Sequence, residues 1–188
     1  MGFFYSSLFK RSNKIIMFGL DAAGKTSIIN YLKNKFGYKT YESGFVPFPY
    51  TNLTFNEFNY KDLNLSVIEI DIGGWSSVNR GKMENKLSQI FKDAKGIICV
   101  IDSCYFDHEE DFFRDSDFIL SHKYLKNLPV LILSNKQDFD KALSPEEIIK
   151  KIKIEKYKEK NWLAVGTSII TGEGIEKGFD WMISILKN

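Results

Sequence analysis

Short apolar segments alternate with longer amphipathic segments along the whole chain. Strands are predicted at residues 14–18, 53–60, 64–71, 96–102, 129–135 and 162–167. Helices are predicted between them at 25–35, 80–91, 108–125, 145–152 and 174–186. Residues 96–101 and 129–133 are almost wholly apolar, which is typical of strands covered on both faces of a parallel sheet. The pattern predicts a three-layer α/β fold with a mostly parallel sheet.

The second and third predicted strands form a hairpin. Residues 53–60 alternate between apolar and polar side chains, and the short turn Lys61-Asp62 leads directly into the next strand. Strands joined by so short a turn run antiparallel, so we expect one antiparallel strand at the edge of the sheet. Further along, Ser144-Pro145-Glu146-Glu147 predicts a capping box at the start of the helix 145–152.

A glycine-rich segment follows the first strand. It reads Gly19-Leu20-Asp21-Ala22-Ala23-Gly24-Lys25-Thr26 and matches the phosphate-binding loop G-x-x-x-x-G-K-[ST]. Its glycines allow a tight turn with backbone N–H groups aimed at a phosphate chain, and the helix after it adds a positive dipole end. Lys25 supplies a charge for the outer phosphates, and the Thr26 hydroxyl is a hard ligand for Mg²⁺. The predicted nucleotide contacts in this segment are Asp21, Ala22, Ala23, Gly24, Lys25, Thr26 and Ser27.

Two later segments narrow the nucleotide to guanine. Asn135-Lys136-Gln137-Asp138 matches N-K-x-D and directly follows an apolar strand. The Asp138 carboxylate can accept hydrogen bonds from N1–H and the 2-amino group of guanine, which adenine does not offer in that arrangement. We expect Asn135 to tie this segment to the phosphate loop and the stem of Lys136 to cover the base. A loop with Ser168 and Ile169 follows the last strand and is predicted to contact the guanine O6 through a backbone N–H.

The segment Asp71-Ile72-Gly73-Gly74 ends the strand 64–71 and matches D-x-x-G. Asp71 is predicted to hold Mg²⁺ through a water molecule, and the N–H of Gly74 to sense the γ-phosphate. Together with Thr26, this segment predicts a magnesium site beside the phosphates.

These segments, with the tail Gly172-Glu173-Gly174-Ile175, resemble the Arf/Arf-like family of small GTPases over nearly the whole chain. The resemblance implies the P-loop small-GTPase fold: a six-stranded, mostly parallel sheet with one antiparallel edge strand and helices on both faces. It implies GTP/GDP cycling with Mg²⁺ in membrane trafficking, read by effectors and controlled by an exchange factor and a GTPase-activating protein. In that family the hairpin 53–71 slides when GTP replaces GDP.

The chain departs from the family pattern in both nucleotide-sensing regions. After Gly74 the family has a glutamine that orients the attacking water, whereas this chain has Trp75, whose indole has one donor and no acceptor. We therefore expect slow intrinsic hydrolysis. The Mg²⁺-binding threonine of the family corresponds to Thr51, with Asn52 or Thr54 as alternatives. An alternative function is a pseudo-GTPase that binds guanine nucleotide without cycling. A third, a P-loop kinase or ATPase, is disfavoured by the N-K-x-D segment.

The amino terminus predicts membrane attachment. Met1-Gly2-Phe3-Phe4-Tyr5-Ser6 matches the myristoylation signal M-G-x-x-x-[ST], with Gly2 as the acylated residue. Aromatic side chains followed by basic ones give the first turns an amphipathic character, which would supply the second membrane signal. The alternative is that these aromatic residues pack on the protein itself. We expect an N-terminal segment 1–13 and a GTPase domain 14–188, located in the cytoplasm and on the cytosolic face of endomembranes such as the Golgi.

Composition excludes other classes. The net charge is only +2 over 188 residues, and no run of basic residues alternates with aromatic ones. Both observations argue against a surface dedicated to nucleic acid. No apolar run approaches the roughly 20 residues that span a membrane. The two cysteines, Cys99 and Cys104, are expected to be reduced thiols, and two distant histidines make a zinc site improbable.

Overall fold

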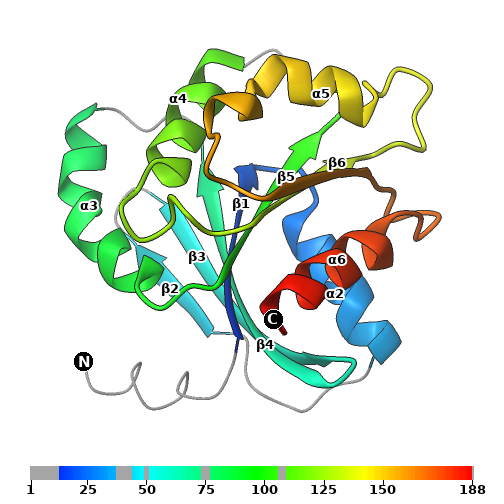
Figure 1. Cartoon of the computed structure of the whole chain (residues 1–188), viewed down its shortest axis with the longest axis horizontal. Helices are drawn as coiled ribbons and strands as arrows, with labels where there is room; N and C mark the ends of the chain where they lie inside the picture. The colour runs from blue at the N-terminus through cyan, green and yellow to red at the C-terminus, as the bar shows by residue number, and fades with distance from the viewer. Residues whose placement is uncertain (1–12, 37–43, 49–50, 73–76, 106–108, 188) are drawn as a thin grey trace.

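The computed structural model describes residues 13–36, 44–48, 51–72, 77–105 and 109–187, which fold into three layers. A central sheet is covered by helices on both faces (Figure 1). The elements follow the chain in the order β1 (Asn13–Leu20), α2 (Lys25–Phe36), β2 (Gly44–Phe48), β3 (Thr51–Tyr60), β4 (Leu63–Ile72), α3 (Ser77–Phe91), β5 (Gly96–Asp102), α4 (Glu109–Leu120), β6 (Val130–Asn135), α5 (Pro145–Ile152), the short 3₁₀ helix η1 (Ile154–Lys156), β7 (Trp162–Gly166) and α6 (Ile175–Leu186).

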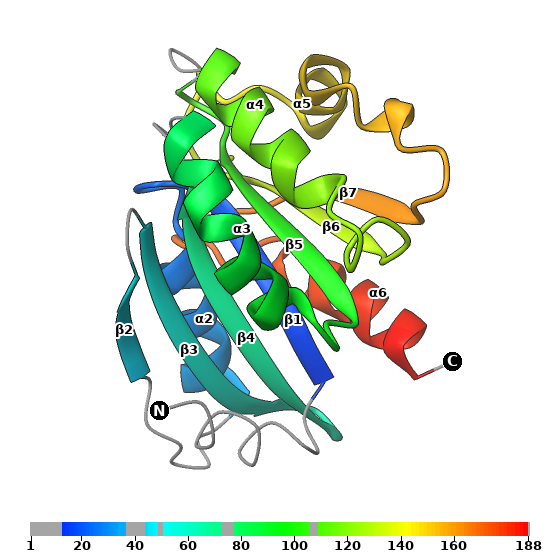
Figure 2. The same cartoon turned by 90° about the vertical axis from the view of Figure 1, so that its left-hand side faces the viewer.

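The sheet has the strand order β2-β3-β4-β1-β5-β6-β7, which can be followed from left to right in Figure 2. β1 pairs in parallel with β4 and β5, and β6 pairs in parallel with β5 and β7. β3 runs antiparallel to both of its neighbours, β2 and β4. The prediction of a mostly parallel sheet with one antiparallel strand and helices on both faces is confirmed.

The structure adds β2 to the six predicted strands, so the described sheet has seven. β2 pairs with β3 from Gly44↔Phe55 to Phe48↔Thr51 and forms the outer edge, which places the antiparallel strand one position in from the edge. The pattern of apolar and polar residues does not predict this strand, because Pro47 lies within it. Proline cannot donate to a strand ladder and is tolerated only at such edges.

The hydrophobic core has two halves, one on each face of the sheet. Successive residues of β1 point to opposite faces, so Ile15 and Met17 join the half beneath α2 and α6. Ile16 and Phe18 join the half beneath α3 and α4. Figure 1 shows α2 and α6 on one side of the sheet and α3, α4 and α5 on the other. This arrangement brings the carboxyl ends of β1, β4, β5 and β6 to one edge of the sheet.

Two helix boundaries follow from local hydrogen bonds. The predicted capping box of α5 is confirmed: Ser144 Oγ accepts from the N–H of Glu147, and the Glu147 carboxylate accepts from the N–H of Ser144. The helix predicted at 108–125 ends earlier, at Leu120. There the side chain of His122 accepts from the N–H of Tyr124 at 3.3 Å, so a side chain replaces the helical carbonyl as partner.

Candidate nucleotide-binding site

The phosphate loop runs from the end of β1 to the first turn of α2. A Cβ on Gly19 would lie 2.2 Å from the carbonyl oxygen of Val100, so only glycine fits there. Gly24 has a φ of +100°, and a Cβ on it would lie 2.3 Å from Nδ2 of Asn135. Ala22 also has a positive φ, of 58°, while its N–H is held by Asp21 Oδ1 at 2.8 Å. The strand–loop–helix geometry required for a phosphate cradle is therefore present.

Lys25 lies across this loop. Its Nζ donates to the carbonyl oxygens of Gly19 and Leu20, at 3.0 and 2.7 Å, and forms an ion pair with Asp71 Oδ1 at 2.7 Å. The side chain is buried, so its charge is directed at the loop rather than at bulk water. The structure thus brings together two predicted residues, Lys25 from α2 and Asp71 from the end of β4.

Thr26 has an unexpected partner. Its Oγ1 donates to Oε2 of Glu69 at 2.7 Å, and Oε1 of Glu69 accepts from Nδ2 of Asn56 at 2.6 Å. Oδ1 of Asn56 in turn accepts from Nζ of Lys33. Thr26 and Lys33 belong to α2, Asn56 to β3 and Glu69 to β4, so this polar chain joins three elements.

Burial shifts the pKa values of the two ionisable groups in this polar chain, Glu69 and Lys33. Glu69, Asn56 and Lys33 are all buried. Burial raises the pKa of Glu69, while the hydrogen bonds from Thr26 and Asn56 and the charge of Lys25 act in the opposite direction. Burial likewise lowers the pKa of Lys33, and Glu69 opposes that shift. Sequence reasoning missed Glu69, although one signal was available: it is a charged residue between Ile68 and Ile70, two positions before Asp71 and so on the same face.

The oxygen atoms at this end of the site suit Mg²⁺. Because the Thr26 hydroxyl gives its hydrogen to Glu69, the lone pairs of Oγ1 stay available to a metal. Asp71 adds a carboxylate close to the same loop. Within the described ranges, no group of three or more His, Cys, Asp or Glu side chains could hold a metal ion by itself. Mg²⁺ is commonly bound by one or two protein carboxylates together with waters and substrate phosphates, and these residues fit that role.

Asn135 links the phosphate loop to the segment that follows β6. Its Nδ2 donates to the carbonyl oxygen of Ala23 at 2.9 Å, which is the tie expected from the sequence. Its Oδ1 accepts from Oγ1 of Thr167 at 3.2 Å. Thr167 is also connected through its backbone, since its carbonyl accepts from the N–H of Gln137 at 3.0 Å. One buried side chain therefore holds three loops in a fixed relation.

Asp138 is held by Ser168. Oγ of Ser168 donates to Oδ1 of Asp138 at 2.6 Å and accepts from the N–H groups of Ile170 and Thr171, at 3.1 and 3.3 Å. The carboxylate is thereby oriented from the loop after β7, in which Ile169 also lies. An oriented carboxylate at this position can accept two parallel N–H donors from a planar base.

Lys136 adds the last part of this region. It has a positive φ of 70°, and its Nζ pairs with Oδ2 of Asp102 at 2.6 Å at the end of β5. Oδ1 of Asp102 accepts from the N–H of Cys104 at 2.9 Å. The ion pair fixes the ammonium at the end of β5, while the side chain of Lys136 stays partly exposed.

The comparison with known proteins decides the family. A model of the ADP-ribosylation factor family matches residues 3–186 of the chain. The chain belongs to the ADP-ribosylation factor family. It is 32% identical to ADP-ribosylation factor-like protein 1 of Saccharomyces cerevisiae over 195 residues, which cover 100% of this chain and 98% of that protein. It is 29% identical to ADP-ribosylation factor K of Dictyostelium discoideum, over 98% of this chain and 94% of that protein. The identity to ADP-ribosylation factor-like protein 2 of Arabidopsis thaliana is 31%, over 93% of this chain and 87% of that protein.

Membership makes this Arf-family chain a small GTPase, a GTP-binding regulatory switch. The resemblance inferred from the sequence is confirmed. No helix among the residues placed in the structure is long and apolar enough to cross a bilayer.

Several predicted residues of the Arf-family chain lie outside the described ones. These are Gly2, Gly74 and Trp75. Thr51 and Asn52 begin β3, but their side chains are also outside the described set. Thr54 lies directly opposite Glu69 in the β3–β4 ladder and so shares the face of β4 that meets α2. The choice among Thr51, Asn52 and Thr54 as a metal ligand stays a prediction.

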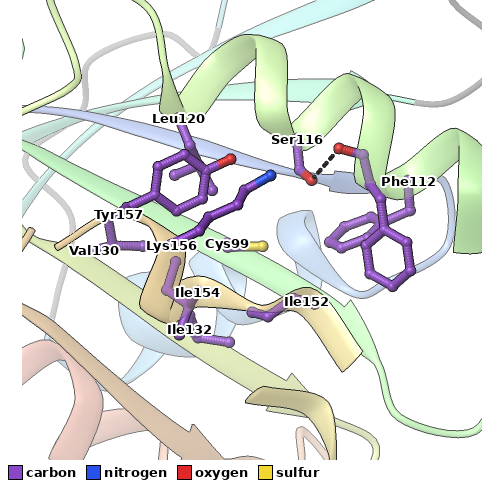
Figure 3. Close-up of a pocket in the computed structure, with 11 residues that line it drawn as sticks. Cys99, Phe112, Ser116, Leu120, Val130, Ile132, Ile152, Ile154, Lys156 and Tyr157 are labelled. Atoms are coloured by element: carbon purple, nitrogen blue, oxygen red, sulfur yellow. Dashed lines mark hydrogen bonds between the residues drawn. The ribbon is translucent and has the colours of Figure 1, made fainter. Parts of the chain in front are cut away.

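A small cavity of the Arf-family chain lies away from this site. It has room for about 20 Å³, roughly the space of a single water molecule. Figure 3 shows its walls coming from α4 on one side and from the α5–η1 segment on the other, with Cys99 between them. Burial strongly raises the pKa of the Cys99 thiol, which keeps it protonated and unreactive. The cavity is a feature of the core and is too small for a nucleotide.

Proposed function

We propose that this chain switches between GDP and GTP forms and, in its GTP form, recruits effectors in membrane trafficking. The observation that carries the proposal is the link made by Asn135. Its contact with Ala23 joins the phosphate loop to the segment containing Asp138, and Ser168 holds that carboxylate. A triphosphate on the loop and a guanine beside Asp138 are therefore read by one connected site. Lys136 covers the base, and the loop at Ser168 and Ile169 approaches its O6.

The phosphates lie on the residues from Asp21 to Ser27 in this proposal. Thr26 and Thr51 would bind Mg²⁺ directly, and Asp71 would hold it through a water. When bound, Mg²⁺ would supply positive charge against the phosphate oxygens. Lys25 supplies a second positive charge. When nucleotide binds, Nζ of Lys25 exchanges its contact with Asp71 or with the loop carbonyls for a phosphate oxygen. This exchange couples the end of β4 to the bound nucleotide. The N–H of Gly74 contacts the γ-phosphate and distinguishes GTP from GDP.

Intrinsic hydrolysis is slow in this proposal because Trp75 follows Gly74. An indole N–H can donate but cannot accept, so it cannot orient a water as a glutamine amide does. A GTPase-activating protein would then supply the missing group. An exchange factor would be needed for release of GDP.

The N-terminal segment attaches the GTP form to the cytosolic face of a membrane. A myristoyl chain on Gly2 binds membranes only marginally, so it needs a second signal. Phe3, Phe4 and the basic residues Lys10 and Arg11 would provide it by inserting aromatic side chains and pairing with anionic headgroups.

Trp75 also favours a second candidate, a pseudo-GTPase that holds guanine nucleotide without cycling. One experiment separates the candidates: identify the nucleotide released on denaturing the purified protein, then measure exchange and single-turnover hydrolysis. A cycling switch releases guanine nucleotide and exchanges it. A pseudo-GTPase releases guanine nucleotide but neither exchanges nor hydrolyses it. Adenine nucleotide, or none, would overturn both.

A further inference from the structure

Glu69 is not among the predicted ligands of Mg²⁺, but it lies beside two of them. It is buried on β4, and both of its carboxylate oxygens accept hydrogen bonds: Oε2 from Thr26 at 2.7 Å and Oε1 from Asn56 at 2.6 Å. Asp71 is two residues further along the strand and thus on the same face. Two carboxylates of one strand therefore approach the beginning of α2, one through Lys25 and the other through Thr26.

The direction of the hydrogen bonds determines what Glu69 can do. A threonine hydroxyl has one hydrogen and two lone pairs. When Thr26 donates this hydrogen to Glu69, the hydrogen does not point toward the metal, and a lone pair of Oγ1 is left to bind the ion. Donating a hydrogen bond to a carboxylate also increases the negative charge on Oγ1, which makes it a stronger ligand for a cation. Partners of this kind hold metal ligands in place and tune their basicity in other metalloproteins.

The rest of the polar chain keeps Glu69 in this position. Lys33 donates to Asn56 Oδ1, and Asn56 donates onward to Glu69, so all donors point toward the carboxylate. Lys33 is on α2, the same helix as Thr26, so both ends of the chain are fixed to one rigid element. If Glu69 turned away from Thr26, the buried amide of Asn56 would lose its acceptor, which is unfavourable.

We propose that Glu69 is a positioning residue of the Mg²⁺ site, which orients the Thr26 hydroxyl toward the metal and adds a negative charge beside it. The inference rests on the proposed nucleotide site. Thr26 and Asp71 would contact the ion or its waters, while Glu69 acts through Thr26. The affinity for Mg²⁺, and with it the metal-dependent retention of nucleotide, depends on this buried carboxylate.

The test is the Mg²⁺ dependence of fluorescent GDP release. Glu69→Gln should raise the Mg²⁺ concentration that half-maximally slows release by about 10- to 100-fold, the range typical for such outer partners. Release in EDTA should be unchanged, because the phosphate and base contacts are intact. Mn²⁺ binding to the GDP complex, followed by its electron paramagnetic resonance signal, should weaken in parallel. Glu69→Asp, which keeps the charge but is one methylene shorter, should show a smaller shift in the same direction and serves as the second variant if the glutamine protein does not fold.

Two control variants separate this role from a purely structural one. Glu57→Gln changes a half-buried carboxylate of the same hairpin that lies outside the polar chain and whose Oε1 has no hydrogen-bond partner among the described residues. Lys33→Met breaks the far end of the chain and leaves the contact between Glu69 and Thr26 in place. Glu57→Gln should keep the wild-type Mg²⁺ curve, and Lys33→Met, which loosens only the far end of the polar chain, should shift the curve clearly less than Glu69→Gln does. The proposal is overturned if Glu69→Gln and Lys33→Met shift the curve equally, or if Glu69→Gln speeds release in EDTA as much as in Mg²⁺. If the wild-type protein retains no guanine nucleotide under any condition, the proposed function itself is wrong, and this inference falls with it.

Discussion

At the scale of single residues, the groups expected to bind nucleotide are in place, whereas the group expected to assist hydrolysis is replaced. Binding groups are held from several sides: Asp138 by Ser168, Asn135 by Ala23 and Thr167. Trp75, in contrast, stands in the sequence where the family resemblance implies a glutamine. We therefore expect strong nucleotide binding together with slow intrinsic GTP hydrolysis.

Replacing Trp75 tests this expectation. A reacting group displaced by about 1 Å can cost about 100-fold in rate, so Trp75→Gln should speed single-turnover GTP hydrolysis by on the order of 10- to 100-fold. Trp75→Leu is the matched control, since it removes the indole without adding a group that can orient water, and it should remain slow. Wild-type hydrolysis as fast as that of the glutamine variant would contradict the assigned role of this position.

At the scale of elements, two sets of contacts join parts of the domain: one links the β3–β4 hairpin to α6, and the other links the end of α4 to α3. Near the hairpin turn, Tyr60 donates to Oδ1 of Asp180 on α6 at 2.8 Å and packs against Phe179 with ring centroids 5.7 Å apart. On the other face, His122 joins the end of α4 to α3. Its Nδ1 accepts from the N–H of Tyr124, so Nε2 carries the hydrogen and donates to Oγ of Ser88 at 2.9 Å.

This geometry predicts a pH-dependent stability. Burial lowers the pKa of His122 below its usual value of about 6.5, with Glu84 opposing the shift and Lys123 adding to it. The unfolded chain therefore binds the proton more tightly than the folded one, so the free energy of unfolding should decrease as the pH falls below about 6.5. Urea unfolding between pH 5 and 8 measures this, and His122→Gln should flatten the decrease over that window. His108→Gln, at the other histidine of the chain, is the control; equal flattening by both variants would contradict the assignment to His122.

The same scale shows what the sequence could and could not predict. The phosphate loop and the N-K-x-D segment were predictable because steric limits at Gly19 and Gly24 and the chemistry of Asp138 act within contiguous residues. Glu69 was not predictable, because its role depends on Thr26, Asn56 and Lys33, which lie on two other elements and meet it only in the folded chain. β2 was missed because a proline-containing edge strand has no alternating pattern of its own.

At the scale of the whole molecule, the nucleotide state should control membrane binding through the segment 1–13. Binding of the myristoylated protein to vesicles of phosphatidylcholine and phosphatidylserine should be stronger with a non-hydrolysable GTP analogue than with GDP. A single acyl chain gives only marginal binding, so any difference must come from exposure of the second, amphipathic signal. Gly2→Ala, which cannot be acylated, should bind weakly in both states. Equal binding of the wild-type protein with both nucleotides would argue against coupling between the switch and the membrane.

The central claim is that two loops, joined by Asn135, form one guanine-specific site. The most direct measurement compares the affinities of the wild-type protein and Asp138→Asn for GDP and xanthosine diphosphate. An amide at this position sets an N–H₂ donor against the 2-amino group of guanine but matches the 2-carbonyl of xanthine, so the variant should lose GDP affinity by at least about 100-fold and prefer the xanthine nucleotide. GDP binding that is unchanged in Asp138→Asn, or wild-type affinity for ADP equal to that for GDP, would contradict the account.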